Sequence, residues 1–228
     1  MLITIFSLAA LIISAIFHEY MHGWVAYKLG DHTAKDAGRL TLNPLAHIDF
    51  FGSIILPLLL FMSKTGFILG WAKPVPYNPY NLRDQKYGGL KVAIGGPGAN
   101  FFLAVFFGLL ARIISISPAL KEDLAIGYFQ GNNDFLLSQM GGSILTSIFV
   151  MSIIICFINL LLMIFNLIPI PPLDGSKVLM AILPYSWQEK MRSLEPYGIF
   201  IILFLLMFGL FTLLWPLILF LFGLFTGL

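Results

Sequence analysis

Residues 135 to 173 contain no charged side chain, and this long neutral stretch constrains the fold more than any other feature of the chain. Of the 228 residues, 59% are hydrophobic and 11% are charged, whereas a soluble domain carries about a quarter charged residues. One water-soluble core cannot bury so much apolar surface, so lipid must be the solvent for most of the chain. The composition therefore predicts an integral, multi-pass membrane protein.

Four apolar stretches are long enough to cross a bilayer, which takes about 20 mostly apolar residues in a helix. They are residues 2–27, 90–116, 141–167 and 196–228. Pro216 lies inside the last stretch and is expected to kink it, or to split it into a helix and a short tail. The sequence therefore predicts an all-α polytopic membrane protein of one domain, residues 1–228, with about four to six transmembrane helices.

The apolar run from Phe50 to Ser63 contains Pro57 and is too short to span comfortably, and after a turn at residues 63–66 a second short apolar run continues to Trp71. The whole stretch from Phe50 to Trp71 could cross the membrane fully, or re-enter and return to its own side. Basic loops prefer the cytoplasm, and basic residues flank the stretch on both sides, which favours the re-entrant form. That topology places the loop of residues 118–139 outside the cell. The flanking basic residues are Lys28, Lys35 and Arg39 before the stretch, and Lys73, Arg83, Lys86 and Lys91 after it.

Two short segments beside this stretch, residues 38–42 and 71–76, have β-like sequences. Backbone that is neither helical nor part of a barrel survives at membrane depth only when it is buried in protein or lines a cavity. We therefore expect a small membrane-associated β-hairpin beside the functional site.

The first apolar stretch ends in His18-Glu19-Tyr20-Met21-His22. Residues four apart share one face of a helix, so the imidazoles of His18 and His22 can bind one metal ion. Glu19 points near the same face and can act as a general base toward water. A charged group inside a spanning helix costs about 2.5–3.5 kcal/mol on insertion scales, which favours a functional site over a polar cluster that only packs helices.

Two histidines leave a zinc site incomplete, because catalytic zinc usually has three protein ligands. The run from Asn166 to Gly175 contains three prolines that break the third apolar stretch, followed by Asp174. Asp174 could be the third ligand, or it could cap the next helix. With a re-entrant Phe50–Trp71 stretch, the helices that carry His18 and Asp174 run in the same direction, so that both sites lie toward the cytoplasmic end. A full span would put them on opposite sides.

With these motifs the chain resembles the site-2 proteases, the zinc metalloproteases of regulated intramembrane proteolysis. The resemblance rests on the His18–His22 motif, on Gly-Pro-Gly-Ala-Asn at residues 96–100, and on the run of residues 166–175. It implies one Zn²⁺ ion bound by His18, His22 and Asp174, with Glu19 as the catalytic acid and base.

The resemblance further implies that Asn166 positions the substrate or polarises its scissile carbonyl. Asn100 either shares that role or caps or packs its own helix. The implied partner is a membrane protein cut within or near a transmembrane segment, with the active site on the cytoplasmic side of a bacterial cell membrane. The chain looks like a compact form without PDZ or CBS domains, with a catalytic core of about residues 1–184 and a C-terminal membrane segment of about residues 196–228.

Two alternatives remain open. A membrane zinc endopeptidase of the type that processes prenylated proteins takes its third ligand from a glutamate on a later helix, but the available glutamates are expected in loops: Glu122, Glu189 and Glu195. A catalytically inactive metal-binding membrane protein, or a transporter, has no need of Glu19. A net charge of +2 without a basic block does not indicate nucleic acid. Nothing in the sequence indicates the oligomeric state.

Overall fold

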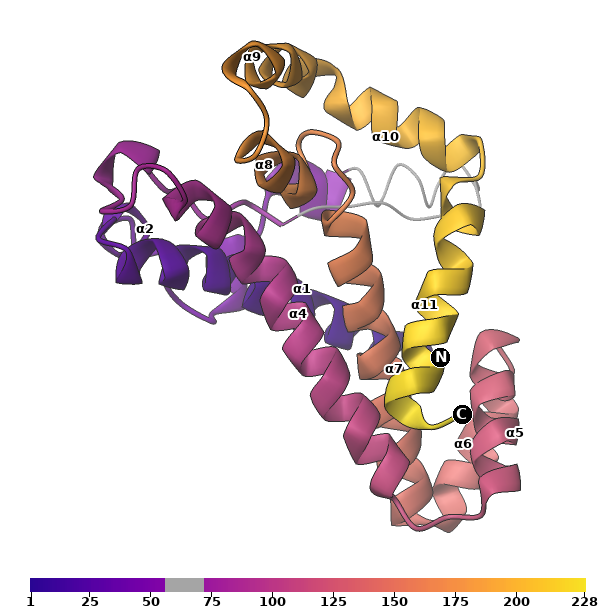
Figure 1. Cartoon of the computed structure of the whole chain (residues 1–228). Helices are drawn as coiled ribbons and strands as arrows, with labels where there is room; N and C mark the ends of the chain where they lie inside the picture. The colour runs from indigo at the N-terminus through magenta and orange to yellow at the C-terminus, as the bar shows by residue number, and fades with distance from the viewer. Residues whose placement is uncertain (56–71) are drawn as a thin grey trace.

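The computed structural model of the chain describes residues 1–55 and 72–228 (Figure 1). Its framework is three long helices: α1 (Leu2–Lys28), α4 (Gly88–Ile113) and α7 (Ile144–Asn166). Each is long and apolar enough to cross a membrane. They confirm the first three predicted spans with small shifts at the ends.

The last predicted span is broken into α10 (Gly198–Met207) and α11 (Leu210–Thr226). The bend between the helical segment Tyr185–Met207, which ends in α10, and α11 is 77°. The break falls at Gly209, whose φ of 89° is a left-handed conformation that glycine adopts without steric strain. Pro216 lies inside α11, which continues through it to Thr226, so of the two outcomes predicted for Pro216 the split into a helix and a short tail is wrong. The described residues thus provide three spanning helices, one fewer than the lowest number predicted, or four if the bent pair is one span, which is the lower end of the predicted four to six.

Shorter elements connect these helices. The short α-helices are α2 (Thr33–Asp36), α5 (Pro118–Phe129), α6 (Asn133–Gly142), α8 (Asp174–Met180) and α9 (Tyr185–Leu194). The 3₁₀ and π turns are η1 (Pro44–His47), η2 (Phe50–Ile55), η3 (Pro79–Asn81) and η4 (Glu195–Tyr197).

The region expected as an external loop, residues 118–139, is a pair of helices, α5 and α6 (Figure 1). Ser117 and Asn132 cap the two helices by accepting backbone N–H groups, as N-cap residues do. Leu124 and Leu136 are fully buried in the same hydrophobic core as α7. Apolar burial therefore orders a segment whose charged residues suggested a loop.

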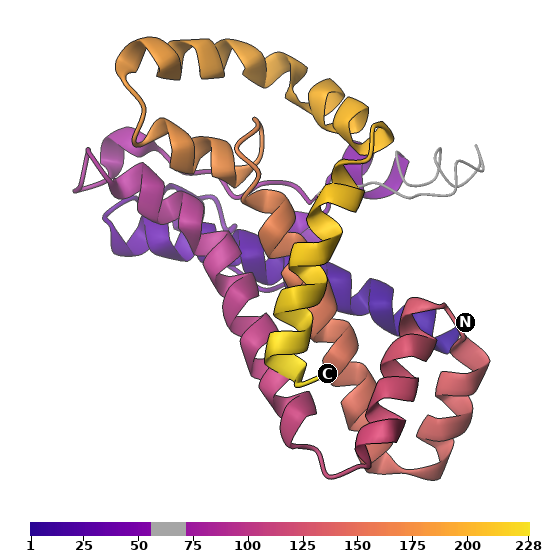
Figure 2. The same cartoon turned by 45° about the vertical axis from the view of Figure 1, so that its right-hand side comes forward.

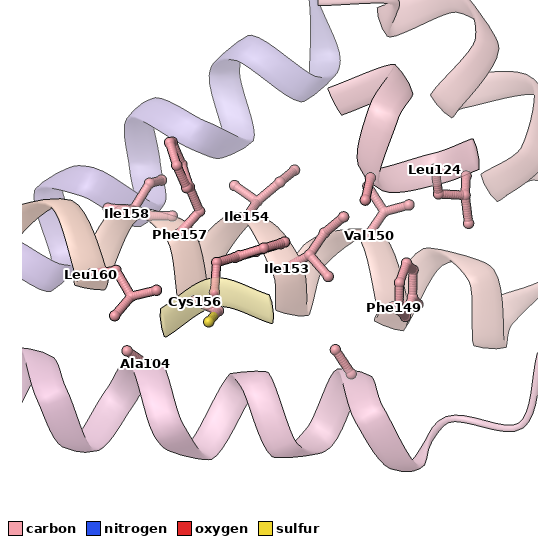
Figure 3. Close-up of a cluster of buried hydrophobic side chains, with 14 of the residues drawn as sticks. Ala104, Leu124, Phe149, Val150, Ile153, Ile154, Cys156, Phe157, Ile158 and Leu160 are labelled. Atoms are coloured by element: carbon pink, nitrogen blue, oxygen red, sulfur yellow. The ribbon is translucent and has the colours of Figure 1, made fainter. Parts of the chain in front are cut away.

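The core lies where α7 packs against α4 and α1 (Figure 3). Phe149, Ile153 and Ile154 of α7 are fully buried, and small residues such as Ala104 on α4 let the helices approach closely. At Gly108 a Cβ atom would lie 2.6 Å from the Cβ of Phe225 and 3.2 Å from the Sγ of Cys156. Small residues at helix contacts are typical of membrane proteins, and here they bring α4, α7 and α11 together.

The described residues contain no β-strand, so the predicted β-hairpin is wrong. Residues 72–76 run without regular secondary structure, and Pro74 and Pro76 have no N–H group to donate to a ladder. The N–H of Val75 between them donates to the side chain of Glu19 on α1. The segment is therefore held by α1 rather than by a partner strand.

The predicted re-entrant stretch lies mostly in residues 56–71, outside the described part of the chain. Its flanks meet, because the N–H of Lys73 donates to the carbonyl of His47 over 2.8 Å. α1 and α7 both run toward the end of the molecule where α4 begins (Figures 1 and 2). The Nε2 of His18 and the Oδ2 of Asp174 lie 3.1 Å apart, so the end of α1 that carries His18 and the segment after α7 that carries Asp174 lie side by side.

Asp31 connects the loop after α1 to the loop that precedes α4. Its carboxylate is fully buried and accepts four hydrogen bonds, from the N–H and Oγ1 of Thr33, the N–H of Asn78 and the Nδ2 of Asn81. Burial alone would raise the pKa of Asp31, but the hydrogen bonds from Thr33, Asn81 and Asn78 outweigh it and hold that pKa below its usual value.

We expect Asp31→Asn to lower the free energy of unfolding at neutral pH by about 1.5–3 kcal/mol, the usual contribution of hydrogen bonds to a charged group. A lowered pKa stabilises the fold above the unfolded value of about 3.9, and this stabilisation is lost as the pH falls through the lower folded value. The difference between variant and wild type should therefore shrink in acid. Thermal unfolding in detergent at several pH values measures it. Asp36→Asn, at an exposed carboxylate of α2, is the control and should change little.

Candidate metal centre

His18 and His22 lie one turn apart on α1 and are both buried, with 5% and 8% of their surface exposed. Their Nε2 atoms are 3.0 Å apart. Glu19 is half-buried and lies beside them, with its carboxylate within 4.8 Å of both imidazoles. The first predicted motif thus presents two ring nitrogens and one carboxylate to the same small volume.

Asp174 completes this group from the segment that follows α7. Its Oδ2 is 3.1 Å from the Nε2 of His18 and 3.0 Å from the Nε2 of His22. The chain turns sharply here because Pro169, Pro171 and Pro172 cannot continue α7. Gly175 is also required, since a Cβ atom at that position would overlap the carbonyls of residues 167 and 168.

Hydrogen bonds on the far side of each ring indicate where the imidazole protons lie. The Nδ1 of His22 is 2.7 Å from the carbonyl of Val92, and the Nδ1 of His18 is 2.5 Å from the Oδ1 of Asn100. Because both partners are acceptors, each Nδ1 carries the proton and each Nε2 of a neutral ring presents a lone pair. When both rings are neutral, three atoms with lone pairs, the two Nε2 atoms and the Oδ2 of Asp174, face one another without a proton between them.

This arrangement fits a zinc ion. Ligand atoms about 2.0–2.1 Å from zinc at tetrahedral angles lie about 3.3 Å apart, close to the spacing of these three atoms. A cation removes the repulsion between the lone pairs, and the Nδ1 hydrogen bonds are the outer contacts that metal-binding histidines usually make. Two imidazoles and one carboxylate are also a ligand set that zinc enzymes use.

Gly96 on α4 lies directly against the two histidines. A Cβ atom at this position would be 2.5 Å from the Nε2 of His18 and closer still to the Nε2 of His22. Only glycine leaves room for both rings and for an ion between them. Gly96 belongs to the Gly-Pro-Gly-Ala-Asn run of residues 96–100, but the sequence predicts no role for it. The only feature that could have drawn attention to Gly96 is that a glycine lies inside an apolar helix.

A pocket of about 130 Å³ opens beside the three converging atoms. Asn166 is half-buried and lines this pocket, with its Nδ2 donating to the carbonyl of Leu162 over 2.9 Å. Lys177 also lines it, and its Nζ is 3.3 Å from the Oδ1 of Asp174. The remaining lining residues are His18, Glu19, His22, Pro74, Val75, Tyr77, Val92, Ala93, Pro172 and Asp174.

Asn100 has a different position from Asn166. It is fully buried behind the ring of His18 and is not among the residues that line the pocket. The structure therefore brings His18, Glu19, His22, Asp174 and Asn166 to one pocket and places Asn100 one layer deeper.

Comparison with known proteins agrees with this picture. Residues 6–209 match the model of Peptidase family M50. A protein of Bacillus subtilis (strain 168) named "Putative zinc metalloprotease YwhC" is 36% identical over 91% of this chain and 83% of its own length. A Rip2 protein of Mycolicibacterium smegmatis, named in the same way as a zinc metalloprotease, is 27% identical over 87% of this chain, which spans 65% of that relative's length. No solved structure matches the chain significantly. The chain therefore belongs to Peptidase family M50, the family of the site-2 proteases that its motifs resemble.

Proposed function

We propose that this protein is an intramembrane zinc metalloprotease that hydrolyses peptide bonds within or near the transmembrane segments of other membrane proteins. The observation that carries the proposal is the convergence of His18, His22 and Asp174, with Glu19 beside them, at the end of helices able to span a membrane. Membership of Peptidase family M50 and the names of two relatives as zinc metalloproteases support it.

In this proposal His18, His22 and Asp174 hold one zinc ion. When bound, zinc supplies a Lewis acid that polarises a carbonyl oxygen and makes water a better nucleophile. Glu19 takes the proton from the attacking water and returns it to the leaving amine. The N–H of Val75 donates to the Oε2 of Glu19 over 3.0 Å and orients that carboxylate at the edge of the pocket.

The size of the pocket limits the form in which a substrate is cut. A helix with its side chains is about 10–12 Å across, far wider than a pocket of about 130 Å³ admits. A transmembrane helix must therefore unwind locally before one of its peptide bonds reaches Glu19. Asn166, on the pocket wall, is suited to hold the exposed peptide group of the unwound segment, because an amide can pair with both N–H and C=O groups.

The proposal includes an active site toward the cytoplasmic face of a bacterial cell membrane, and the distribution of charge supports it. Basic residues concentrate near the end of the molecule that holds the site, among them Lys28, Lys35, Lys73 and Lys177. The opposite end carries α5 and α6, which contain Glu122, Asp123 and Asp134 beside one lysine. Positive charge on one side is typical of the cytoplasmic face.

The test is reconstitution of the full chain in lipid vesicles with candidate single-span membrane proteins. We expect Glu19→Gln to keep its zinc and to cut the substrate about 10²–10⁴-fold more slowly, the usual contribution of a general base. Mass spectrometry of the products locates the cut, which should fall in or near the span. Cleavage that persists in Glu19→Gln, or that falls only in soluble loops, would contradict the proposal. Cleavage only of prenylated substrates would favour the prenyl-protein-processing type.

A further inference from the structure

We propose that a backbone carbonyl of α7, that of Ile155, determines which ring nitrogen of His18 carries the proton, acting through the side chains of Asn159 and Asn100. Both asparagines are then positioning residues that prepare His18 to bind a metal ion. This inference rests on the proposed function only in taking His18 as a zinc ligand.

The three side chains behind His18 form a buried chain of hydrogen bonds. The Nδ2 of Asn159 lies 2.9 Å from the carbonyl of Ile155 and 2.9 Å from the Oγ of Ser14. The Oδ1 of Asn159 lies 2.8 Å from the Nδ2 of Asn100, whose Oδ1 faces the Nδ1 of His18. Asn159 and Asn100 are fully buried and Ser14 is 3% exposed. The chain links α7, α4 and α1 at the depth of the apolar core.

The donor and acceptor roles along this series of hydrogen bonds follow from its first member, the carbonyl of Ile155. A backbone carbonyl can only accept, so the atom of Asn159 that faces Ile155 must be the NH₂ group. The other atom of that amide is then the oxygen, which requires the NH₂ group of Asn100 opposite it. Asn100 must therefore turn its oxygen to His18, and the Nδ1 of His18 must carry the proton. The Nε2 lone pair is left facing Asp174 and His22.

A second contact gives Asn100 the same orientation. Its Nδ2 is 3.4 Å from the backbone carbonyl of Ser14, a longer bond than the one to Asn159. His22 reaches the same tautomer directly, because its Nδ1 donates to the carbonyl of Val92. Among the residues that the structure describes, no backbone carbonyl bonds the Nδ1 of His18, so a side-chain amide supplies the acceptor. An amide can turn over, and for this reason it needs Asn159 behind it.

The plain alternative is that these residues only join the helices, since polar side chains often hydrogen-bond between membrane helices. The two roles differ in one respect. If Asn159 serves only to join helices, its loss has the same effect whatever residue occupies position 100. If Asn159 serves to orient an amide, its loss has no effect on zinc binding when position 100 carries a carboxylate, because a carboxylate accepts from His18 with either oxygen.

A double-mutant cycle on the purified full chain separates these roles, with zinc affinity measured by competition with a chelator. We expect Asn159→Leu to weaken zinc binding about tenfold, at the lower end of the 10–100-fold that loss of an outer hydrogen bond to a metal ligand usually costs, and Asn100→Leu to weaken it about as much or more. Asn100→Asp should bind zinc better than Asn100→Leu. In the Asn100→Asp background, Asn159→Leu should cost nothing, or improve binding, because it removes an oxygen that faces the new carboxylate.

Two control variants also remove a buried polar group but leave the donor and acceptor roles from Ile155 to His18 as they are. Ser152→Ala removes a buried hydroxyl of α7 that donates to the carbonyl of Ile148 over 2.7 Å, within its own helix, and should leave zinc affinity unchanged. Ser14→Ala removes one partner of Asn159 but leaves the carbonyl of Ile155, so it should have a small effect. Thermal unfolding of each variant without zinc measures any general loss of packing.

The outcomes are distinct. If wild type binds no zinc, the proposed function fails. Two results would overturn the role of Ile155 and Asn159 in orienting Asn100 while the proposed function stands, provided that wild type binds zinc. In the first, Asn159→Leu weakens zinc binding equally with Asn100 and with Asn100→Asp. In the second, Asn159→Leu weakens zinc binding in neither background. A loss of zinc affinity on Asn159→Leu that occurs with Asn100 and not with Asn100→Asp supports this orienting role.

Discussion

Replacing Gly96 by alanine is expected to leave the protein without zinc and without peptidase activity. The added Cβ atom would lie 2.5 Å from the Nε2 of His18 and nearer still to the Nε2 of His22. A zinc ion bound by both nitrogens lies about 2.0–2.1 Å from each, so the methyl group and the ion compete for one volume. Neither ring can move far, because Asn100 and Val92 hold the other side of each ring.

The matched control is Gly98→Ala, two residues further along α4. A Cβ atom at Gly98 meets only the Cγ2 of Ile94, at 4.0 Å. Alanine favours a helix over glycine by about 1 kcal/mol, so this control should keep its zinc and be as stable as wild type or slightly more so. Zinc content by elemental analysis, together with helix content by circular dichroism, checks both variants. A Gly96→Ala protein that is folded and carries a full equivalent of zinc would show that the ion does not lie between the histidines.

Much of the site could be predicted because its chemistry is local in the sequence. Helical spacing alone places His18 and His22 on one face of α1, and the contact with Asp174 shows that this residue reaches them from the proline-broken segment after α7. The three long spans were also predictable, since an apolar segment of about 20 residues satisfies its backbone in lipid by forming a helix, and only a closed barrel offers another way. The roles of these residues as ligands and base stay predictions until metal and activity are measured.

Other features depend on packing between distant segments, which a single sequence does not reveal. Gly96 owes its importance to two side chains of another helix, and Asn159 to a partner on α4. Residues 118–139 are helical because Leu124 and Leu136 are buried in the common core, although their charged neighbours suggested a loop. The β-hairpin was predicted from local β-like composition, but the prolines near Val75 and its contact with Glu19 leave no ladder to form.

The second large effect concerns which acid binds the metal. Glu19 has a carboxylate within 4.8 Å of both imidazoles, so by distance alone it could be the third ligand in place of Asp174. The contacts separate the two residues. The Oδ2 of Asp174 lies 3.0 and 3.1 Å from the two Nε2 atoms, whereas the Oε2 of Glu19 accepts the N–H of Val75. These contacts favour Asp174 as the ligand and Glu19 as the base.

We therefore expect Asp174→Ala to lose its zinc on dialysis against a weak chelator, while Glu19→Ala keeps a full equivalent; neither should cleave a substrate. The loss follows because two neutral imidazoles alone leave the ion one ligand short of the usual three and without a compensating charge. Zinc content of the two dialysed proteins, measured in parallel with wild type, checks this. A reversed result, with zinc retained in Asp174→Ala and lost in Glu19→Ala, would exchange the two roles and leave Asp174 as the group that handles the proton.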